Sequence, residues 1–326
     1  MNFRDFRRWG WRFFAGAPWP TTTASPSEVQ HQVATNQLMV RAFYFFIGFL
    51  AIISVKGWPR TLQQINLIPL WPTSWISFVP TTYGILAIHC LYLGSCVLTM
   101  IFPGSRLLRF ITFLGIFQWI SLDNSLGKIS HSMHLVVFVA FIFIFLPQEW
   151  DHRALMRQVR VRLAQTIWAA QALILLTYTM AGISKIVASL HQVAHGEVSY
   201  FHPLGLPWVI AGRLALTGSD SFLGAWFIER PWLCWPMMLG AIYLEFFSFW
   251  ILFRPKLYAW WALGLILFHL ASYFTMTILF SQSTFLLALF FTCAAARSQP
   301  FNLRELVVAL PLFGPVLRRL WCAKSN

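Results

Sequence analysis

The chain contains eight stretches of predominantly apolar residues whose lengths approach or reach the thickness of a lipid bilayer. A helix rises about 1.5 Å per residue, so about 20 residues cross a hydrocarbon core of about 30 Å. The stretches lie at about 38–55, 82–102, 107–122, 132–147, 163–185, 232–253, 257–275 and 277–296. The sequence therefore predicts an all-α, polytopic membrane helix bundle with about eight transmembrane helices.

Composition supports a membrane protein over a soluble domain, because 58% of the residues are hydrophobic and only 10% are charged. The stretches at 107–122 and 132–147 are short, and we expect them to stand nearly upright or to lie in a thinned bilayer. The segment 203–228 is moderately apolar and interrupted by Gly and Pro. We expect it to be a re-entrant or interfacial segment.

The distribution of basic residues predicts the orientation. The chain has 24 Lys and Arg against 10 Asp and Glu, for a net charge of +14. If both termini are cytoplasmic, the basic residues that fall on the outer side are Lys56, Arg60, Lys128, Arg213 and Arg230. Most of the others fall on the inner side, as the positive-inside rule requires. The charge is spread over short loops, so we expect contact with lipid and no nucleic acid, and compact loops favour a bacterial inner membrane.

We divide the chain into three parts. Residues 1–34 are expected to form a basic amphipathic arm on the inner leaflet and a linker, because aromatic residues alternate with arginines there. Residues 35–297 form the transmembrane domain, and residues 298–326 a cytoplasmic interfacial tail. None of the five cysteines belongs to a Cys-x-x-Cys pair, which argues against redox or structural zinc chemistry.

Ionisable residues inside the apolar stretches mark a candidate site. His269 lies within an apolar run from Leu257 to Phe280, and Glu245 lies on the preceding stretch. Such groups are costly in hydrocarbon unless they face a polar interior. Counting from the inner loops places His269 roughly 18 Å and Glu245 roughly 12 Å into the membrane. We therefore expect the two side chains to be neighbours, either as part of a site or as a structural pair between helices.

Lys185 and several outer residues form a second set. Lys185 lies at the end of its apolar stretch, roughly 33 Å along the helix and near the outer membrane boundary. It could be a catalytic base, or it could be an anchor whose side chain extends to lipid headgroups. His131 and His134 share a helical face, and they could belong to a site or be ordinary interfacial residues. Other polar residues expected near an outward-facing cavity are His89, Asp123, Asn124, His191, His195, Glu197 and His202. His191, His195 and His202 have side chains that can bind a metal, but their irregular spacing argues against a metal site.

The order of motifs resembles a known family. The segment from Tyr178 to Lys185 is similar to the aromatic-x-x-Ala-Gly-x-x-Lys segment of the vitamin K-dependent γ-carboxylases and of the related bacterial horizontally transferred transmembrane (HTTM) domains. Glu245, Phe253-Arg254-Pro255 and Phe268-His269-Leu270 follow in the family's order, and the similarity covers about residues 35–297. Ile129 and Ser130 replace the family's Asn-Asn pair, and Ser272 replaces another Asn.

The resemblance implies roles for four residues. Lys185 would be the base that deprotonates a reduced quinone, and His131, followed by Ser132, would match a His-Ser pair tied to carboxylation. His269 and Glu245 would match the family's Phe-His-Leu histidine and its upstream acidic position. We therefore expect a carboxylase-like membrane enzyme that acts at the outer leaflet on a vitamin K-like quinol, a peptide substrate, or both. Glu245 could orient His269, and His131 or His269 could handle a second proton.

Two other functions compete with the enzyme hypothesis. Stand-alone HTTM proteins of this size resemble a component of sporulation-delaying toxin maturation, so the chain could be a non-catalytic membrane subunit that works with partner membrane proteins in peptide maturation or export. Transport is less favoured, because the sequence shows no inverted repeat and no pair of broken helices. Enzyme and subunit are expected to differ in whether Lys185 points inward or toward lipid.

Overall fold

The computed structural model describes residues 26–55, 67–126, 131, 133–148, 157–293 and 309–312. Of these residues, 81% are helical and none lies in a strand, which confirms the all-α fold class. The chain divides into two compact units at Leu173 and Ile174, within the long helix α7 (Arg157–Ala194). Most of the predicted N-terminal arm, the Ser132 position and most of the predicted tail lie outside the described residues.

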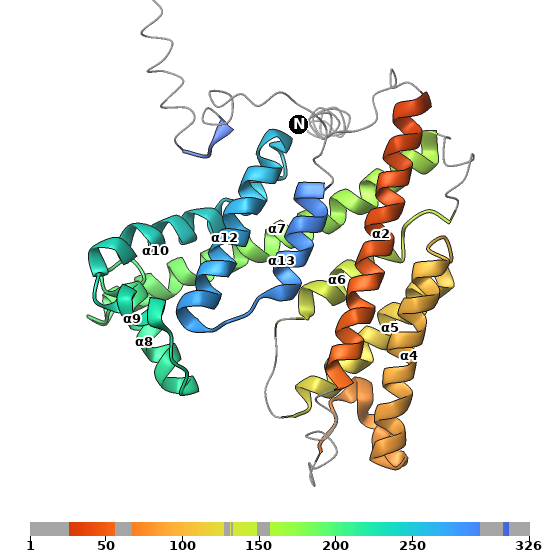
Figure 1. The fold of residues 1–326 in the computed structure, drawn as a ribbon, viewed down its shortest axis with the longest axis horizontal. Helices are drawn as coiled ribbons and strands as arrows, with labels where there is room; N and C mark the ends of the chain where they lie inside the picture. The colour runs from red at the N-terminus through yellow and green to blue at the C-terminus, as the bar shows by residue number, and fades with distance from the viewer. Residues whose placement is uncertain are drawn as a thin grey trace, which may run out of the picture. The chain divides into compact units, whose positions relative to one another are not determined.

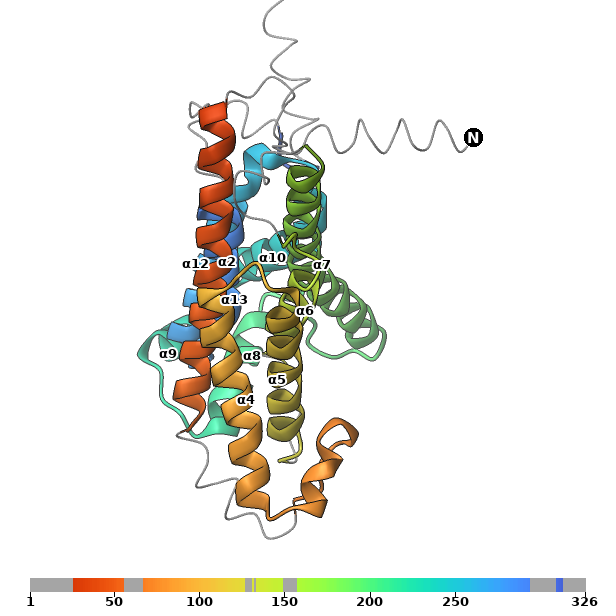
Figure 2. The same ribbon diagram turned by 90° about the vertical axis from the view of Figure 1, so that its right-hand side faces the viewer.

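The first unit is built around α4 (Thr81–Ile101), which packs between α2 (Pro26–Ser54) and α5 (Arg106–Asn124) (Figure 2). Close contact depends on Gly115 of α5, since a Cβ there would lie 2.9 Å from the Tyr92 Cα of α4. Tyr92 in turn donates a hydrogen bond of 2.8 Å to the Ile47 carbonyl of α2. The short α6 (His134–Phe143) packs on α5, and the 3-10 helix η2 (Trp71–Phe78) contacts α4 and α5.

A buried arginine joins three helix ends in this unit. Arg109 is fully buried near the start of α5. Its guanidinium donates to the Pro103 carbonyl at 2.5 Å, the Leu146 carbonyl at 2.6 Å and the Pro147 carbonyl at 3.2 Å. These carbonyls follow α4 and α6, where the backbone lacks intrahelical donors. In the sequence, Arg109 counts among the basic residues of the inner side. In the structure, its side chain also joins the neighbouring ends of α4, α5 and α6 through hydrogen bonds.

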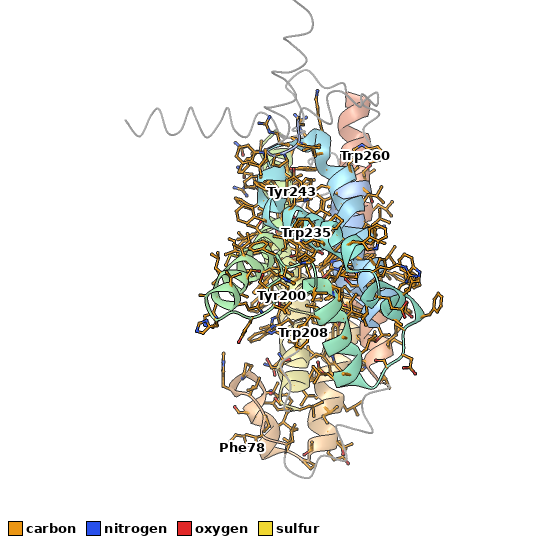
Figure 3. The ribbon with its side chains drawn as sticks, turned by 90° about the vertical axis from the view of Figure 1, so that its left-hand side faces the viewer. Phe78, Tyr200, Trp208, Trp235, Tyr243 and Trp260 are labelled. Carbon is orange, nitrogen blue, oxygen red and sulfur yellow. The ribbon has the colours of Figure 1, made fainter. Side chains whose placement is uncertain are left out.

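The second unit holds the rest of α7 and the helices that follow it (Figure 1). These are α8 (Gly205–Thr217), α9 (Phe222–Ile228), α10 (Pro231–Phe246), α11 (Ser248–Ile251), η4 (Pro255–Leu257), α12 (Tyr258–Met276), α13 (Ser281–Leu287) and the π-helix η5 (Ala288–Cys293). α12 contacts α8, α9, α10, α13 and η5 and is therefore central to the unit. Trp208 on α8 and Trp235 on α10, both labelled in Figure 3, are exposed at its surface.

Four described helices are long and apolar enough to cross a membrane: Ala34–Ser54, Thr81–Ile101, Gln158–Ala194 and Pro255–Met276. The structure shows how three of the other stretches fold. The stretch 232–253 is interrupted at Phe247, between α10 and α11. The described part of the stretch 277–296 contains α13 followed by a π-helix. The segment 203–228 forms the two helices α8 and α9, separated by Gly218 in a left-handed conformation.

Candidate functional site

One face of α7 carries the site in the second unit. Tyr178, Gly182 and Lys185 stand at positions i, i+4 and i+7 and therefore share a face of the helix. Gly182 lies directly against the end of α10, where a Cβ would be 2.6 Å from the Phe246 nitrogen and 3.0 Å from the Glu245 carbonyl carbon. Only glycine permits this backbone approach. The approach brings α7 close enough for Lys185 to reach across to α10.

Lys185 and Glu245 form an ion pair between α7 and α10. The Lys185 Nζ donates to the Glu245 Oε1 at 2.7 Å and to the Oε2 at 2.5 Å. The Lys185 side chain is 28% exposed, whereas that of Glu245 is 5% exposed. The prediction that Lys185 ends its helix is wrong, because α7 continues to Ala194. Lys185 points to a buried carboxylate, which argues against a free anchor that extends to headgroups.

His269 has a different partner from the one we predicted. Its Nε2 lies 2.6 Å from the Tyr178 hydroxyl, and the imidazole is 5% exposed. Its ring centroid lies 4.7 Å from that of Phe280 and 5.3 Å from that of Phe268. We expected Glu245 to be the neighbour that orients His269, but the Glu245 oxygens bind Lys185 and the hydrogen bond to His269 comes from Tyr178. Both hydrogen bonds to the Glu245 carboxylate come from Lys185 on α7. The depth estimate had placed Lys185 too far outward to reach Glu245.

The two pairs nevertheless belong to one cluster. Tyr178 and Lys185 lie on the same face of α7, so the hydrogen bond to His269 and the ion pair with Glu245 both start from one helix face. Tyr178 and Lys185 are two turns apart on α7, Glu245 lies near the end of α10, and His269 lies on α12. Three helices thus contribute a cation, an anion, a phenol and an imidazole, which are groups suited to proton transfer.

The interruption of α10 is held by side chains from neighbouring helices. The Thr179 hydroxyl accepts a 2.8 Å hydrogen bond from the Phe249 N–H and lies 3.2 Å from the Phe246 carbonyl, to which it donates. The Trp261 indole donates to the Leu244 carbonyl at 3.2 Å. Backbone groups that the helix break leaves without intrahelical partners are therefore satisfied, as burial requires. The same contacts fix the backbone that carries Glu245.

The predicted histidines of the first unit form a separate pair. His131 and His134 place their Nδ1 atoms 3.2 Å apart, and the His131 side chain is exposed. His89, which we expected to face an outer cavity, is only 4% exposed and packs edge-on against Trp119 at 5.3 Å. His131 belongs to a different unit from Lys185, Glu245 and His269, and the geometry of the candidate site is built from these three residues and Tyr178.

The histidines after Lys185 are arranged along the end of α7 and the following loop. The His191 and His195 rings stack at 4.2 Å, and the His202 Nδ1 accepts a 3.1 Å hydrogen bond from the Leu204 N–H. Within the described part of the chain, no group of three or more His, Cys, Asp or Glu residues could hold a metal ion. The contacts described for His191, His195 and His202 are local to the end of α7 and the loop after it.

The sequence reasoning missed the roles of Tyr178, Thr179 and Gly182, although all three lie in the motif quoted for the family resemblance. A small residue one turn before a lysine inside an apolar helix is a usable signal for close helix contact. The helical spacing of Tyr178 and Lys185 indicates a common face. What the sequence does not contain is the identity of the opposing helices.

Comparison with known proteins gives no relative for this chain: no family model, no curated protein and no solved structure matches it.

Proposed function

We propose that the chain is a membrane enzyme of the HTTM and γ-carboxylase type, in which Lys185 acts as a base on a lipid-soluble quinol. The observation that carries the proposal is the Lys185–Glu245 ion pair, with one partner 28% exposed and the other 5% exposed. A buried pair of opposite charges inside an apolar protein costs desolvation, and hydrophobic side chains often stabilise such a position equally well. A functional requirement explains why both charges are present.

Proton exchange within the pair supplies the chemistry. Lys185 can accept a proton only as the neutral amine, and the adjacent Glu245 carboxylate can take up the ammonium proton through either hydrogen bond. In a low-dielectric site the neutral acid and amine compete with the ion pair, because both charged forms lose hydration. The amine would then deprotonate the quinol hydroxyl to give a quinolate beside Lys185. Tyr178 and His269 would provide a second route for the proton.

The surroundings of Lys185 support a substrate that arrives from lipid. Phe246, whose backbone lies against Gly182 one turn before Lys185, is 37% exposed, so apolar surface lies close to the partly exposed ammonium. A lipid-soluble quinol can approach such a surface laterally, whereas a water-soluble substrate gains nothing from it. A peptide substrate remains part of the proposal as the acceptor that the family resemblance implies.

We also propose that the chain crosses a bacterial inner membrane about eight times, with both termini cytoplasmic. Four described helices meet the length and hydropathy of a span, and α5, α6, α10 with α11, and α13 with η5 would supply the others. Two contacts support this order in the first unit. The Leu70 N–H donates to the Ser125 hydroxyl at 3.0 Å, which joins two loops assigned to the outer side. Arg109 joins two loops assigned to the inner side.

The test separates a base from a structural crosslink. We would purify the wild type, Lys185→Arg and Lys185→Ala in lipid nanodiscs, add a reduced short-chain naphthoquinol without oxygen, and record the absorbance of the quinolate. Arginine keeps the ion pair with Glu245 but does not lose its proton, so it cannot act as a base. The proposal predicts a quinolate signal in the wild type and its loss in both variants.

The competing function is a non-catalytic membrane subunit in which the ion pair only joins α7 to α10. In that case Lys185→Arg retains stability and cellular function, and Lys185→Ala loses both. An arginine variant with full function would reject the enzyme proposal and leave the subunit function standing. Loss of quinolate in Lys185→Arg with unchanged thermal stability would reject the crosslink.

A further inference from the structure

The C-terminal end of α7 carries two histidines with the spacing of a metal chelate. His191 and His195 stand four residues apart, and the His195 N–H donates to the His191 carbonyl at 3.2 Å, which continues the helical pattern. Their side chains therefore share one face, where the two rings stack with centroids 4.2 Å apart. Both residues are exposed. Two histidines at positions i and i+4 on one helical face can bind the same metal ion.

The tautomer of His195 is decided by its hydrogen bond. Its Nδ1 atom lies 2.8 Å from the His191 carbonyl oxygen, which can only accept, so Nδ1 carries the hydrogen. The neutral imidazole then has an unprotonated Nε2. Metal-binding histidines typically donate their other ring N–H to a carbonyl or carboxylate, because this orients the ring and raises the basicity of the ligand nitrogen. His195 thus has the form that a metal ligand requires.

The charges around the pair favour a cation. The C-terminal end of a helix carries a partial negative charge, and both histidines stand at that end of α7. In the sequence, Glu197 is the only charged residue between Lys185 and Arg213. Its N–H donates to the Gln192 carbonyl at 2.9 Å, which holds this exposed residue next to the end of the helix. A bound cation would therefore meet negative charge from the backbone and from Glu197.

We propose that His191 and His195 bind a divalent ion of the late first-row transition metals, with copper(II) bound most tightly. Imidazole nitrogens and water oxygens match the tetragonal coordination of copper(II), which binds such donors more strongly than its neighbours in the series do. With bonds of about 2.0 Å, adjacent ligand nitrogens lie about 3 Å apart, and the exposed rings can tilt from their stacked arrangement to meet this requirement. Water fills the remaining positions, so the site is independent of the proposed function and of Lys185.

Two other histidine groups serve as controls, because their nitrogens are engaged differently. His131 and His134 lie at the start of α6 with their Nδ1 atoms 3.2 Å apart, so one hydrogen shared between these atoms joins the pair. The positive end of the α6 dipole also opposes a cation there. His202 uses its Nδ1 lone pair to accept a hydrogen bond from the Leu204 N–H. We therefore expect both groups to bind copper less tightly than the pair on α7.

The experiment uses the full chain in lipid nanodiscs, purified without a polyhistidine tag, with copper(II) as the probe. A calorimetric titration reports the dissociation constant, and electron paramagnetic resonance reports the nitrogen atoms bound to copper. We expect one tight site per chain, with couplings from two imidazole nitrogens. His191→Gln and His195→Gln should each weaken binding by at least about tenfold, since changes even to the outer-shell partners of a metal cost about 10–100-fold. The matched variant His202→Gln should bind as the wild type does.

The outcomes locate the metal. Unchanged affinity in His191→Gln and His195→Gln would overturn the proposal, as would the absence of copper binding by the wild type. Loss of binding in His134→Gln with retention in His191→Gln would assign the copper to the pair on α6 and also overturn it. Thermal unfolding provides a second readout, because a ligand that binds only the folded state stabilises it. Copper should raise the melting temperature of the wild type and His202→Gln more than that of His195→Gln, and equal shifts would refute the site.

Discussion

Replacing Gly182 with alanine tests whether the contact between α7 and α10 assembles the site. The new Cβ would lie 2.6 Å from the Phe246 nitrogen, 2.8 Å from its Cα and 3.0 Å from the Glu245 carbonyl carbon. All three atoms are backbone, so no side chain can rotate away. Ordinary contact begins at 3.4 Å, and the helices must therefore separate by up to the difference of 0.8 Å.

A matched variant isolates this effect from helix propensity. Alanine in place of glycine favours a helix interior by about 1 kcal/mol, and this gain applies equally to Gly240→Ala on α10. No atom lies within 4 Å of the Cβ position at Gly240. The difference between the two variants is then the overpacking cost, about 1–3 kcal/mol. At about 2 °C per kcal/mol, Gly182→Ala should melt about 2–6 °C below Gly240→Ala.

The assay is thermal unfolding of purified protein in detergent, with size-exclusion chromatography of the fraction that remains monodisperse. Quinolate formation in nanodiscs gives the second readout, because separation of the helices would stretch the 2.5 Å contact from Lys185 to Glu245. A charge-assisted hydrogen bond weakens beyond ~2.9 Å. If Gly182→Ala melts at the same temperature as Gly240→Ala, the close approach of the two backbones is not real and the ion pair needs another explanation.

Three further predictions concern other contacts. Thr179→Val should lower the stability by about 1 kcal/mol in chemical denaturation, because the part-buried Phe249 N–H loses its acceptor, while Thr179→Ser should stay near the wild type. Arg109→Leu should leave buried carbonyls unpaired and reduce the yield of folded protein in chromatography far more than a change at an exposed arginine such as Arg254. In a background without native cysteines, cysteine at the exposed Glu197 should react with an impermeant maleimide in intact cells, and cysteine at the exposed Lys256 only after lysis. The reverse pattern would refute the proposed orientation.

The sequence predicted the helical class and the membrane-compatible segments because apolar length is a local property. It also selected Lys185, Glu245 and His269, since an ionisable group in an apolar run is conspicuous without knowledge of the fold. The partners were assigned incorrectly because depth was counted along straight helices from assumed membrane boundaries. α7 extends nine residues beyond Lys185, and α10 ends one residue after Glu245. The end of α10 has no strong local signal and depends on tertiary contacts such as Thr179 with Phe249. The end of α7 does have a local signal, because Gly196 follows it in a left-handed conformation, but the depth estimate used apolar length alone.

Arg109 has a consequence for the order in which the chain enters the membrane. Its guanidinium is fully buried, and two of its three carbonyl partners, Leu146 and Pro147, follow α6. Until α6 is in place, the charge on α5 lacks these acceptors and is stabilised mainly by water or headgroups at the membrane surface. Under the proposed topology, insertion of α5 alone is unfavourable, and we expect α5 and α6 to enter the bilayer together as a helical hairpin. Arg109 would then delay the insertion of α5 until α6 has been synthesised.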